Sequence, residues 1–273
     1  MLAIKHEDGL EKLTRREVVQ RITSARQSGL SIDLSRLDLS GVNLSRLDLN
    51  QANLRGSNLY RTNLYRASLT GADLTGVNLR RANLSRANLQ KARLVDANLN
   101  EANLLKANLE RACLKQTNLS QAKINETTHF NEAELSGLNF DGLDLTKIKL
   151  GTVDFNDASL QGTYLVGLKL AGLDLHGINL SQANLSRADL SKTDLTGANL
   201  RGAKLIGTNL EEAHLIGVDL IGASLEEAYL GGVNLKWAKL DEANLLGAVY
   251  TQATIWPDEF DPEDAGATRV VSR

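Results

Sequence analysis

Leucine recurs at every fifth position over a long stretch of the chain, beginning at Leu34, Leu39 and Leu44. The residue two places before each leucine is usually alanine, and the residue between them is usually Asn or Asp. An apolar–polar–apolar triplet follows the two-residue period of a strand, so both apolar side chains face one side. The two residues that complete each unit are polar, charged or glycine, which is typical of turns. The pattern therefore predicts a short straight segment followed by a corner, repeated many times.

The repeat runs through residues 31–255 with one change of spacing. The first array has centres from 34 to 124 and the second from 130 to 255; of these 45 centres, 39 are leucine, and the last is Ile255. Between Ile124 and Phe130 the spacing is six residues. This extra residue predicts a bulge at a corner or, alternatively, a hinge or recognition loop. The segment concerned is Asn125, Glu126, Thr127, Thr128 and His129.

An amphipathic helix does not explain the five-residue period. On a helix, each step of five residues rotates the leucine by about 140° beyond a full turn, so no apolar stripe forms. Glycine is also frequent at the second turn position, for example at Gly41 and Gly56. A type II turn needs positive φ at its third residue, and glycine adopts positive φ without a steric penalty. We therefore expect β-type segments joined by type II turns.

Segments such as Ala82-Asn83-Leu84-Ser85-Arg86 carry a resemblance to a known family. The unit Ala-(Asn/Asp)-Leu-x-x resembles the pentapeptide-repeat family over residues 31–255. The resemblance implies an all-β solenoid, a right-handed quadrilateral β-helix with four units in each coil of 20 residues. At four units a coil, the 45 repeats correspond to about 11 coils. We interpret residues 31–255 as one continuous solenoid with a one-residue register break at 125–129.

The two ends of the chain depart from the repeat. Residues 10–28 have a helical pattern, with a capping box at residues 14–17 and glycine at position 29 to end the helix. The expected apolar face consists of Val18, Ile22 and Ala25, helped by Val19. The open ends of a β-solenoid need cover, so we expect residues 1–30 to form an N-terminal helical cap. We expect residues 256–273 to form a C-terminal cap with aromatic groups over the last coil, and residues 264–273 to be a loose tail.

Cysteine usage and the start of the chain bear on its compartment. Cys113 is the single cysteine and cannot form an internal disulfide, which favours a reducing compartment. The first eight residues contain no long apolar run. We therefore expect a cytoplasmic protein.

The sequence offers little catalytic or metal-binding chemistry. The four histidines, His6, His129, His176 and His214, have no metal-ligand spacing with one another or with Cys113. In the square model His176 and His214 lie on one side, two coils or about 10 Å apart, which is too far for a shared ligand. Phosphate-binding glycine loops and nucleophile elbows are missing from the sequence. We expect no cofactor, no metal and no enzymatic activity.

Charge is distributed unevenly along the chain. Residues 1–124 hold 20 Lys and Arg against 11 Asp and Glu, whereas residues 125–273 hold 11 against 22. A 20-residue period places one basic residue per coil in a single corner column, and further cations on the neighbouring corners. This candidate strip comprises Arg46, Arg66, Arg86 and Lys106, then Arg61 with Arg81, and Lys91 with Arg111. It is either a solvated face or a docking strip for an anionic protein surface, nucleic acid or lipid.

The acidic half contains apolar residues at turn positions that are usually polar. They are Ile206, Ile216, Ile221 and Leu246. Isolated apolar residues are common on protein surfaces, so these are either scattered exposed side chains or a protein-docking patch.

Three functions remain open from the sequence. The first is a non-catalytic scaffold, monomeric or dimeric, that binds another protein along a flat side. The second follows from the resemblance, because some family members imitate duplex DNA and bind DNA gyrase, a type II topoisomerase; here only the C-terminal half is acidic. The third is binding of nucleic acid or an anionic membrane through the basic strip.

Overall fold

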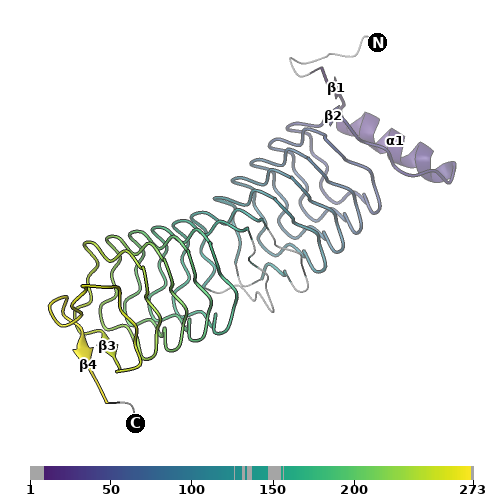
Figure 1. Cartoon of the computed structure of the whole chain (residues 1–273). Coiled ribbons are helices and arrows are strands. Elements are labelled where there is room, and N and C mark those ends of the chain that lie inside the picture. The colour runs from purple at the N-terminus through teal and green to yellow at the C-terminus, as the bar shows by residue number, and fades with distance from the viewer. Residues whose placement is uncertain are drawn as a thin grey trace. The chain divides into compact units, whose positions relative to one another are not determined.

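The computed structural model describes residues 9–125, 127–130, 133, 137–146, 155 and 157–271. Two compact units make up the chain. Unit 1 comprises Met1–Asn139 and Lys147–Asp154, and unit 2 comprises Phe140–Thr146 and Phe155–Arg273. Each unit is a stack of coils (Figure 1). The predicted count of about 11 coils stays a prediction, because it includes residues outside the described ranges.

The coils repeat every 20 residues, as parallel bridges show directly. In unit 1, Asn43 pairs with Asn63, Asn63 with Asn83, and Asn83 with Asn103. In unit 2, Asn179 pairs with Asn199 in the same way. Leucines at the five-residue centres are buried throughout the described coils, apart from the ends, and form the core with the small residues two places before them. Four five-residue sides per coil therefore follow from sequence period and pairing together.

Extended segments in the coils are short. The named strands are β1 (Glu11–Lys12), β2 (Leu37–Asp38), β3 (Val249–Tyr250) and β4 (Thr268–Arg269), each of two residues. β1 pairs in parallel with β2, and β3 pairs in parallel with β4. Elsewhere in the described coils each side contributes a single bridge, because a corner interrupts the chain after three extended residues.

Corners have the geometry expected of type II turns. In the turn that begins at Leu49, the amide of Ala52 donates to the Leu49 carbonyl at 3.1 Å, and Gln51 has φ of 58°. The Gln51 amide also donates to Thr70 in the next coil at 2.9 Å. Glycine fills only some of these positions; the others hold Arg, Lys, Gln, Glu, Asp or Trp. The left-handed conformation is thus imposed by stacking and not only by glycine.

The outward Asn and Asp side chains stabilise the corners as well as the stack. The amide of Asn83 donates to Oδ1 of Asn63 in the preceding coil at 3.3 Å, as the sequence predicts. The more frequent bond is local: the backbone amide of Ser45 donates to Oδ1 of Asn43, two residues earlier, at 3.1 Å. Such a bond mimics a backbone turn, which explains why the position favours Asn and Asp over longer polar residues.

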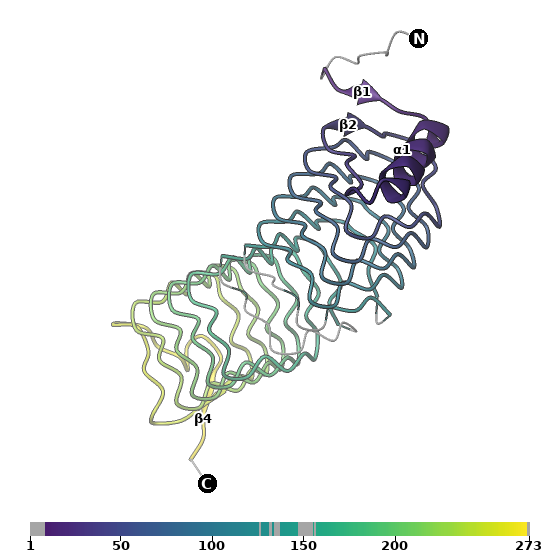
Figure 2. The same ribbon diagram turned by 90° about the vertical axis from the view of Figure 1, so that its right-hand side faces the viewer.

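Helix α1 (Arg15–Gln27) begins with the predicted capping box, in which the amide of Thr14 donates to Glu17 at 2.7 Å. It ends at Gly29 in a Schellman motif. Val18 and Ile22 are buried as predicted, whereas Val19 is exposed, because adjacent residues on a helix face different directions. The prediction that the helix begins at residue 10 is wrong, since β1 lies there. Figure 2 shows α1 alongside the first coils of unit 1.

The C-terminal end contains a second extra residue that the sequence reading missed. The carbonyl of Ile255 accepts from Leu235, and Ile255 bridges Asn234, so it occupies the outward Asn position. Its side chain is 49% exposed. Thr254 takes the inward position before it, where its hydroxyl donates to the Leu230 carbonyl at 2.7 Å. The assignment of Ile255 as a core centre is therefore wrong by one residue.

Aromatic residues gather at this end, as predicted. Trp256 stacks on Phe260 with ring centroids 5.4 Å apart, and Tyr250 meets the Trp256 ring edge-to-face. The expectation of a loose tail from residue 264 is wrong for most of its length. β4 pairs with β3, and Ala267 is buried, so the chain rejoins the stack.

The register break at residues 125–129 has the same form as the C-terminal one, except that Glu126 lies outside the described residues. The Thr128 amide donates to the Asn125 carbonyl at 2.8 Å, and the Thr128 hydroxyl donates to Leu104 at 3.0 Å. His129 then bridges Asn108, which restores the register. These bonds favour the simple bulge over a hinge or recognition loop.

Candidate functional site

Four cations of the predicted strip stand in one corner column of unit 1, here called the cation column: Arg46, Arg66, Arg86 and Lys106. All four are exposed and adopt positive φ between 56° and 63°. The backbone amides of Arg46, Arg66 and Arg86 donate to the next coil at 2.9, 3.1 and 2.9 Å. The backbone beneath the column is therefore fixed, and the charges recur at the coil spacing of about 4.8 Å.

The positions around the cation column are mostly neutral. Ser45, Tyr65, Ser85 and Leu105 precede its members, and the next outward positions are Asp48, Ser68, Asn88 and Asn108. The single acid in this set, Asp48, forms an ion pair with Arg26 of α1 at 2.7 Å. Within the described ranges, the four column cations make no ion pair. Their charge is directed to solvent.

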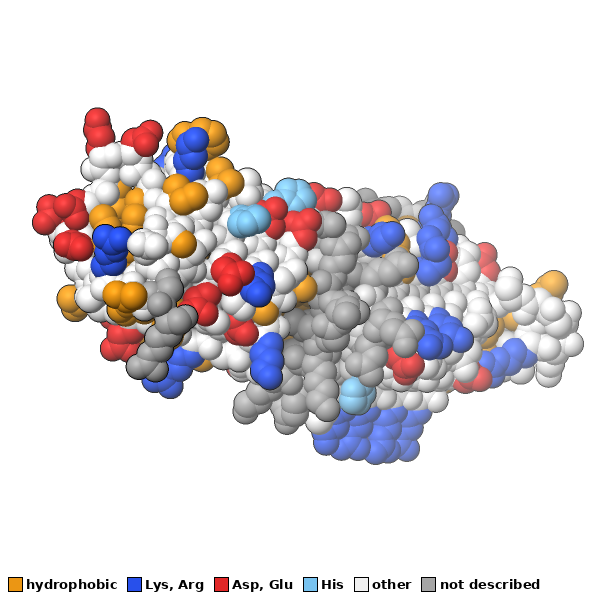
Figure 3. Space-filling view, turned by 60° about the horizontal axis from the view of Figure 1, so that its bottom comes forward, with side chains coloured by type: hydrophobic (Ala, Val, Ile, Leu, Met, Phe, Trp, Pro, Cys, Tyr) orange, Lys and Arg blue, Asp and Glu red, His pale blue; other side chains and the backbone are white. Residues whose placement is uncertain are grey.

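An aromatic ring supports one member of the column. The guanidinium of Arg66 lies 5.3 Å from the ring centroid of Tyr65, within cation–π range. Tyr65 is half-buried. Lys and Arg side chains form a continuous ridge on one face in Figure 3.

A second corner column holds Arg61 and Arg81, but acid neutralises part of it. Glu101 is the next member and contacts Arg81 at 2.6 Å and Arg80 at 2.9 Å. Hydrogen bonds from Arg81 and then Arg80 lower the pKa of Glu101, and the hydrogen bond to Glu101 raises the pKa of Arg81. Arg61 lies 5.3 Å over the Tyr60 ring. This column is therefore a weaker candidate than the cation column.

The remaining two strip residues, Lys91 and Arg111, follow one another in a third column, 20 residues apart and both at positive φ. Both are exposed. The structure thus arranges the predicted strip as one uninterrupted column of four cations and two shorter columns.

The four apolar residues of the predicted docking patch in unit 2 do not lie together. The 20-residue register places Ile206 and Leu246 in one column, two coils apart with Glu226 between them. Ile216 and Ile221 lie in two further columns. The three isoleucines are half-buried, whereas Leu246 is 66% exposed. The geometry therefore favours scattered surface residues.

Histidine and acidic side chains meet on one side of unit 2. Nδ1 of His176 lies 2.7 Å from Oδ1 of Asp174, and bridges link Asp174 to Asp194 and Asp194 to His214. The hydrogen bond to Asp174 raises the pKa of His176, and that from His176 lowers the pKa of Asp174. Among the described residues, no cluster of three or more His, Cys, Asp or Glu is arranged to hold a metal. Cys113 is half-buried at an outward position that bridges Arg93.

Helices able to cross a bilayer were sought in the described part of the chain, and none is sufficiently long and apolar.

These features define a class of protein: a solenoid of 20-residue coils built from five-residue sides around inward leucines. The family model for pentapeptide repeats matches residues 32–71, 43–81, 82–121, 150–187, 158–197 and 193–232. The matches cover more than half of the chain. The protein therefore belongs to the pentapeptide-repeat family.

Solved structures provide further comparisons. The chain is 30% identical to HetL, a pentapeptide-repeat protein involved in heterocyst differentiation regulation in the cyanobacterium Nostoc sp. strain PCC 7120. That match covers 91% of this chain and 99% of HetL, with a TM-score of 0.38. A pentapeptide-repeat protein from the thylakoid lumen of Arabidopsis thaliana is 29% identical over 44% of this chain and 69% of its own, with a TM-score of 0.23.

QnrB1, a plasmid-mediated fluoroquinolone resistance protein, is more distant. It is 17% identical over 87% of this chain and 90% of its own, with a TM-score of 0.30. Comparison with curated proteins found no match.

Proposed function

We propose that this protein is a non-enzymatic scaffold that binds an acidic surface of another protein along the cation column of unit 1. The observation that carries the proposal is the run of four exposed cations, Arg46, Arg66, Arg86 and Lys106, without an ion-pair partner among the described residues. A column of three coil steps is about 14 Å long, which suits a row of carboxylates on a folded partner.

Electrostatics support binding rather than a merely solvated face. Two unit charges 5 Å apart repel by about 0.8 kcal/mol in bulk water, and the column contains three such neighbouring pairs. An anionic partner relieves this repulsion, so the column favours association and steers approach. Tyr65 and Arg66 add the residue types that are enriched at protein interfaces.

A protein partner is favoured over nucleic acid. Four cations neutralise only about four phosphates, which gives weaker and less salt-dependent binding than the six to ten contacts of typical DNA-binding proteins. Beside the column lie Asn63, Asn83, Ser68 and Asn88, which are neutral hydrogen-bonding groups rather than a platform of aromatic rings for stacking bases.

DNA mimicry by unit 2 has no comparable support. Glu212, Glu227 and Glu242 occupy three different corner columns, since their positions differ by 15 residues and not by 20. The acids of unit 2 therefore do not form a continuous row resembling a phosphate backbone. A supercoiling assay with DNA gyrase is expected to show no effect at high micromolar protein.

The proposed scaffold has a covered N-terminal end and a cytoplasmic location. Arg15 donates to the carbonyl of Asn43, and Arg26 donates to the carbonyl of Asp48 at 2.8 Å. With Val18 and Ile22 buried, these bonds support a role for α1 as the cap of the first coils. The resemblance that supplies the right-handed coil also supports the scaffold role.

Charge reversal tests the proposal. Partners are captured from an extract of the native cell on the immobilised protein and on Arg66→Glu with Arg86→Glu. Glutamate is compatible with these turns, because Glu101 and Glu212 already adopt positive φ of 59°. At least one captured protein is expected to bind the double variant tenfold or more weakly after purification, and to bind the wild type less tightly as salt rises.

The matched control is Arg187→Glu with Lys192→Glu in unit 2, where both residues are exposed and have positive φ. This control is expected to retain the partner. If the partner binds both double variants as well as the wild type, the cation column is not the docking site. Charge-dependent binding to duplex DNA or phosphatidylglycerol vesicles, with no captured protein lost, contradicts a protein partner.

A further inference from the structure

The last full coil of unit 2 leaves one of its sides unpaired. In earlier coils the inward leucine amide donates to the coil ahead, as Leu220 does to Lys239 at 2.9 Å. The amide two residues later does the same, as Gly222 does to Asp241 at 2.9 Å. Within the part of the chain that the structure describes, the amides of Leu240 and Glu242 make no such bond. Residues 238–242 are therefore an open strand edge.

The carbonyl of this edge is unpaired as well. In the preceding coil the Val218 carbonyl accepts from Lys239 at 2.9 Å, whereas the equivalent carbonyl of Ala238 accepts from no described residue. The edge thus offers two donors and one acceptor in the register that every earlier coil uses. An extended segment laid in parallel satisfies all three groups.

The chain itself does not provide that segment. After the extra residue at 251–254, Pro257 lacks an amide and the chain turns, with Phe260 donating to the Pro257 carbonyl at 3.3 Å. The chain rejoins the stack only at β4, which pairs with β3 on a different side. The side formed by residues 238–242 is bypassed.

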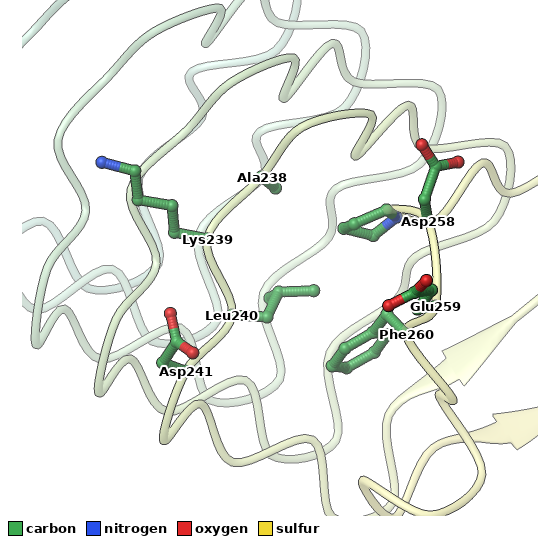
Figure 4. A pocket seen from close by; sticks show the side chains of 8 residues that line it. Ala238, Lys239, Leu240, Asp241, Asp258, Glu259 and Phe260 are labelled. Carbon is green, nitrogen blue, oxygen red and sulfur yellow. The ribbon is translucent and has the colours of Figure 1, made fainter.

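A cavity of about 370 Å³ lies between this edge and the bypassing loop. Residues 238–241 form one wall, and residues 257–260 form the other (Figure 4). Leu240, Pro257 and Phe260 make it apolar at its base. By the register of the coils, the middle residue of an added strand directs its side chain inward, as Leu240 does in the coil before. The cavity has room for one large apolar side chain there.

The rim of the cavity is acidic. Asp241 and Glu242 at the edge, and Asp258 and Glu259 on the loop, are all exposed. Lys239 is the single cation among the lining residues. A second copy of this edge carries the same negative charge and is repelled, whereas a segment with Lys or Arg on either side of its apolar residue is attracted.

We infer that residues 238–242 and the adjoining cavity bind an extended basic segment of another polypeptide, which adds one strand to the C-terminal coil. One residue of this segment donates to Ala238 and accepts from Leu240. The following apolar residue enters the cavity, and the next accepts from Glu242. This site is independent of the cation column of unit 1.

A synthetic peptide tests the inference. The probe is a nine-residue, fluorescently labelled peptide of alternating Lys and Thr with one central Leu, titrated with the full chain and followed by anisotropy. Saturable binding is expected, with at least tenfold weaker binding when the amide before the central Leu is N-methylated or when every Lys is replaced by Glu. On binding, the amides of Leu240 and Glu242 are expected to become protected from hydrogen exchange.

The protein variant is Asp258→Lys with Glu259→Lys, and its matched control is Glu211→Lys with Glu212→Lys. Both are adjacent exposed acids whose second member has positive φ, 62° at Glu259 and 59° at Glu212, but the control pair does not line the cavity. The first variant is expected to lose peptide binding at least tenfold, and the control less than threefold.

Three results overturn the inference. The first is absence of peptide binding at millimolar concentration. The second is equal loss in both double variants, which indicates non-specific attraction. The third is concentration-dependent self-association in sedimentation velocity that disappears in Asp258→Lys with Glu259→Lys, which identifies a second copy of the chain as the occupant.

Discussion

Thr254 donates its hydroxyl hydrogen to the carbonyl oxygen of Leu230 at 2.7 Å, across a step of 24 residues. Inward hydroxyls in the regular coils make the same bond across 23 residues, as Thr62 does to Leu39. Thr128 repeats the 24-residue bond to Leu104 at 3.0 Å. The hydroxyl therefore spans the place where one extra residue enters a coil, and it does so at both register breaks.

Replacing Thr254 by valine is expected to lower the free energy of unfolding by about 1–3 kcal/mol. Valine preserves the shape of the side chain but leaves the buried carbonyl of Leu230 without its donor. It also removes the acceptor for the Thr251 amide, which lies 3.2 Å from the hydroxyl. Chemical denaturation of the two proteins measures the difference. Gln252→Ala in the same loop is the control and is expected to have little effect, because Gln252 is exposed. Equal stability of Thr254→Val and wild type contradicts the role given to the hydroxyl.

Corner positions are expected to reject β-branched residues. Among the described residues with positive φ, none is Val, Ile or Thr, although Arg, Lys and Glu are frequent. Gly197 has φ of 66° and no neighbour within 4 Å of an added Cβ, so only backbone strain limits a substitution there. Gly197→Val is expected to cost about 1–2 kcal/mol more than Gly197→Lys, measured by thermal or chemical unfolding. Equal costs for the two variants contradict a positive φ at this corner.

Loss of the capping box is expected to loosen α1. Thr14→Ala removes the side-chain acceptor for the Glu17 amide and is expected to cost about 1 kcal/mol, seen as faster hydrogen exchange in Arg15–Gln27. Hydrogen bonds from the Thr14 backbone and then its side chain lower the pKa of Glu17. This stabilisation is complete above the ordinary carboxyl pKa and is lost as pH falls through the lowered value. Exchange in α1 that is independent of both Thr14→Ala and acid contradicts the box.

Asp174 is expected to set the titration of His176. The hydrogen bond to Asp174 raises the pKa of His176, so Asp174→Asn is expected to shift the imidazole midpoint downward in an NMR titration. The contribution of the pair to folding is present below the ordinary histidine pKa and is lost as pH rises through the raised pKa of His176. At the acid end it is lost as pH falls through the lowered pKa of Asp174. An unchanged midpoint in the variant shows that the 2.7 Å contact does not persist in solution.

The sequence alone was sufficient to predict the repeat, because its physical basis is local. A buried leucine every fifth residue and a turn after it determine the sides, and the capping box at Thr14 and Glu17 marked α1. The column from Arg46 to Lys106 followed from the period once a 20-residue coil was assumed, since residues one coil apart share a corner.

What the sequence reading missed depends on contacts between distant residues. Ile255 looked like a core centre because it follows Tyr250 by five residues, yet the Thr254 hydroxyl shifts the register by one. The repeat of a polar residue three positions before threonine, Asn125 before Thr128 and Thr251 before Thr254, was the available signal. β1 was missed because Glu11–Lys12 has no strand pattern of its own and pairs only through β2.

The candidate site was also predicted incompletely. Charge counts did not reveal that Glu101 pairs with Arg81 and so weakens the second column, because ion pairing depends on side-chain geometry across a corner. The open edge at Leu240 and Glu242 had no sequence signal, since an unpaired amide is seen only when the next coil is shown to be missing from that side.

Spin-label distance in solution tests the cation column most directly. Labels are attached at Arg46→Cys and Lys106→Cys in a Cys113→Ser background, with Arg46→Cys alone as the unbroadened reference. Because three coil steps separate the two positions, they lie about 14 Å apart, and strong dipolar broadening in continuous-wave EPR is expected. A doubly labelled spectrum identical to the reference, which requires a separation of more than about 25 Å, contradicts the 20-residue coil and the column built on it.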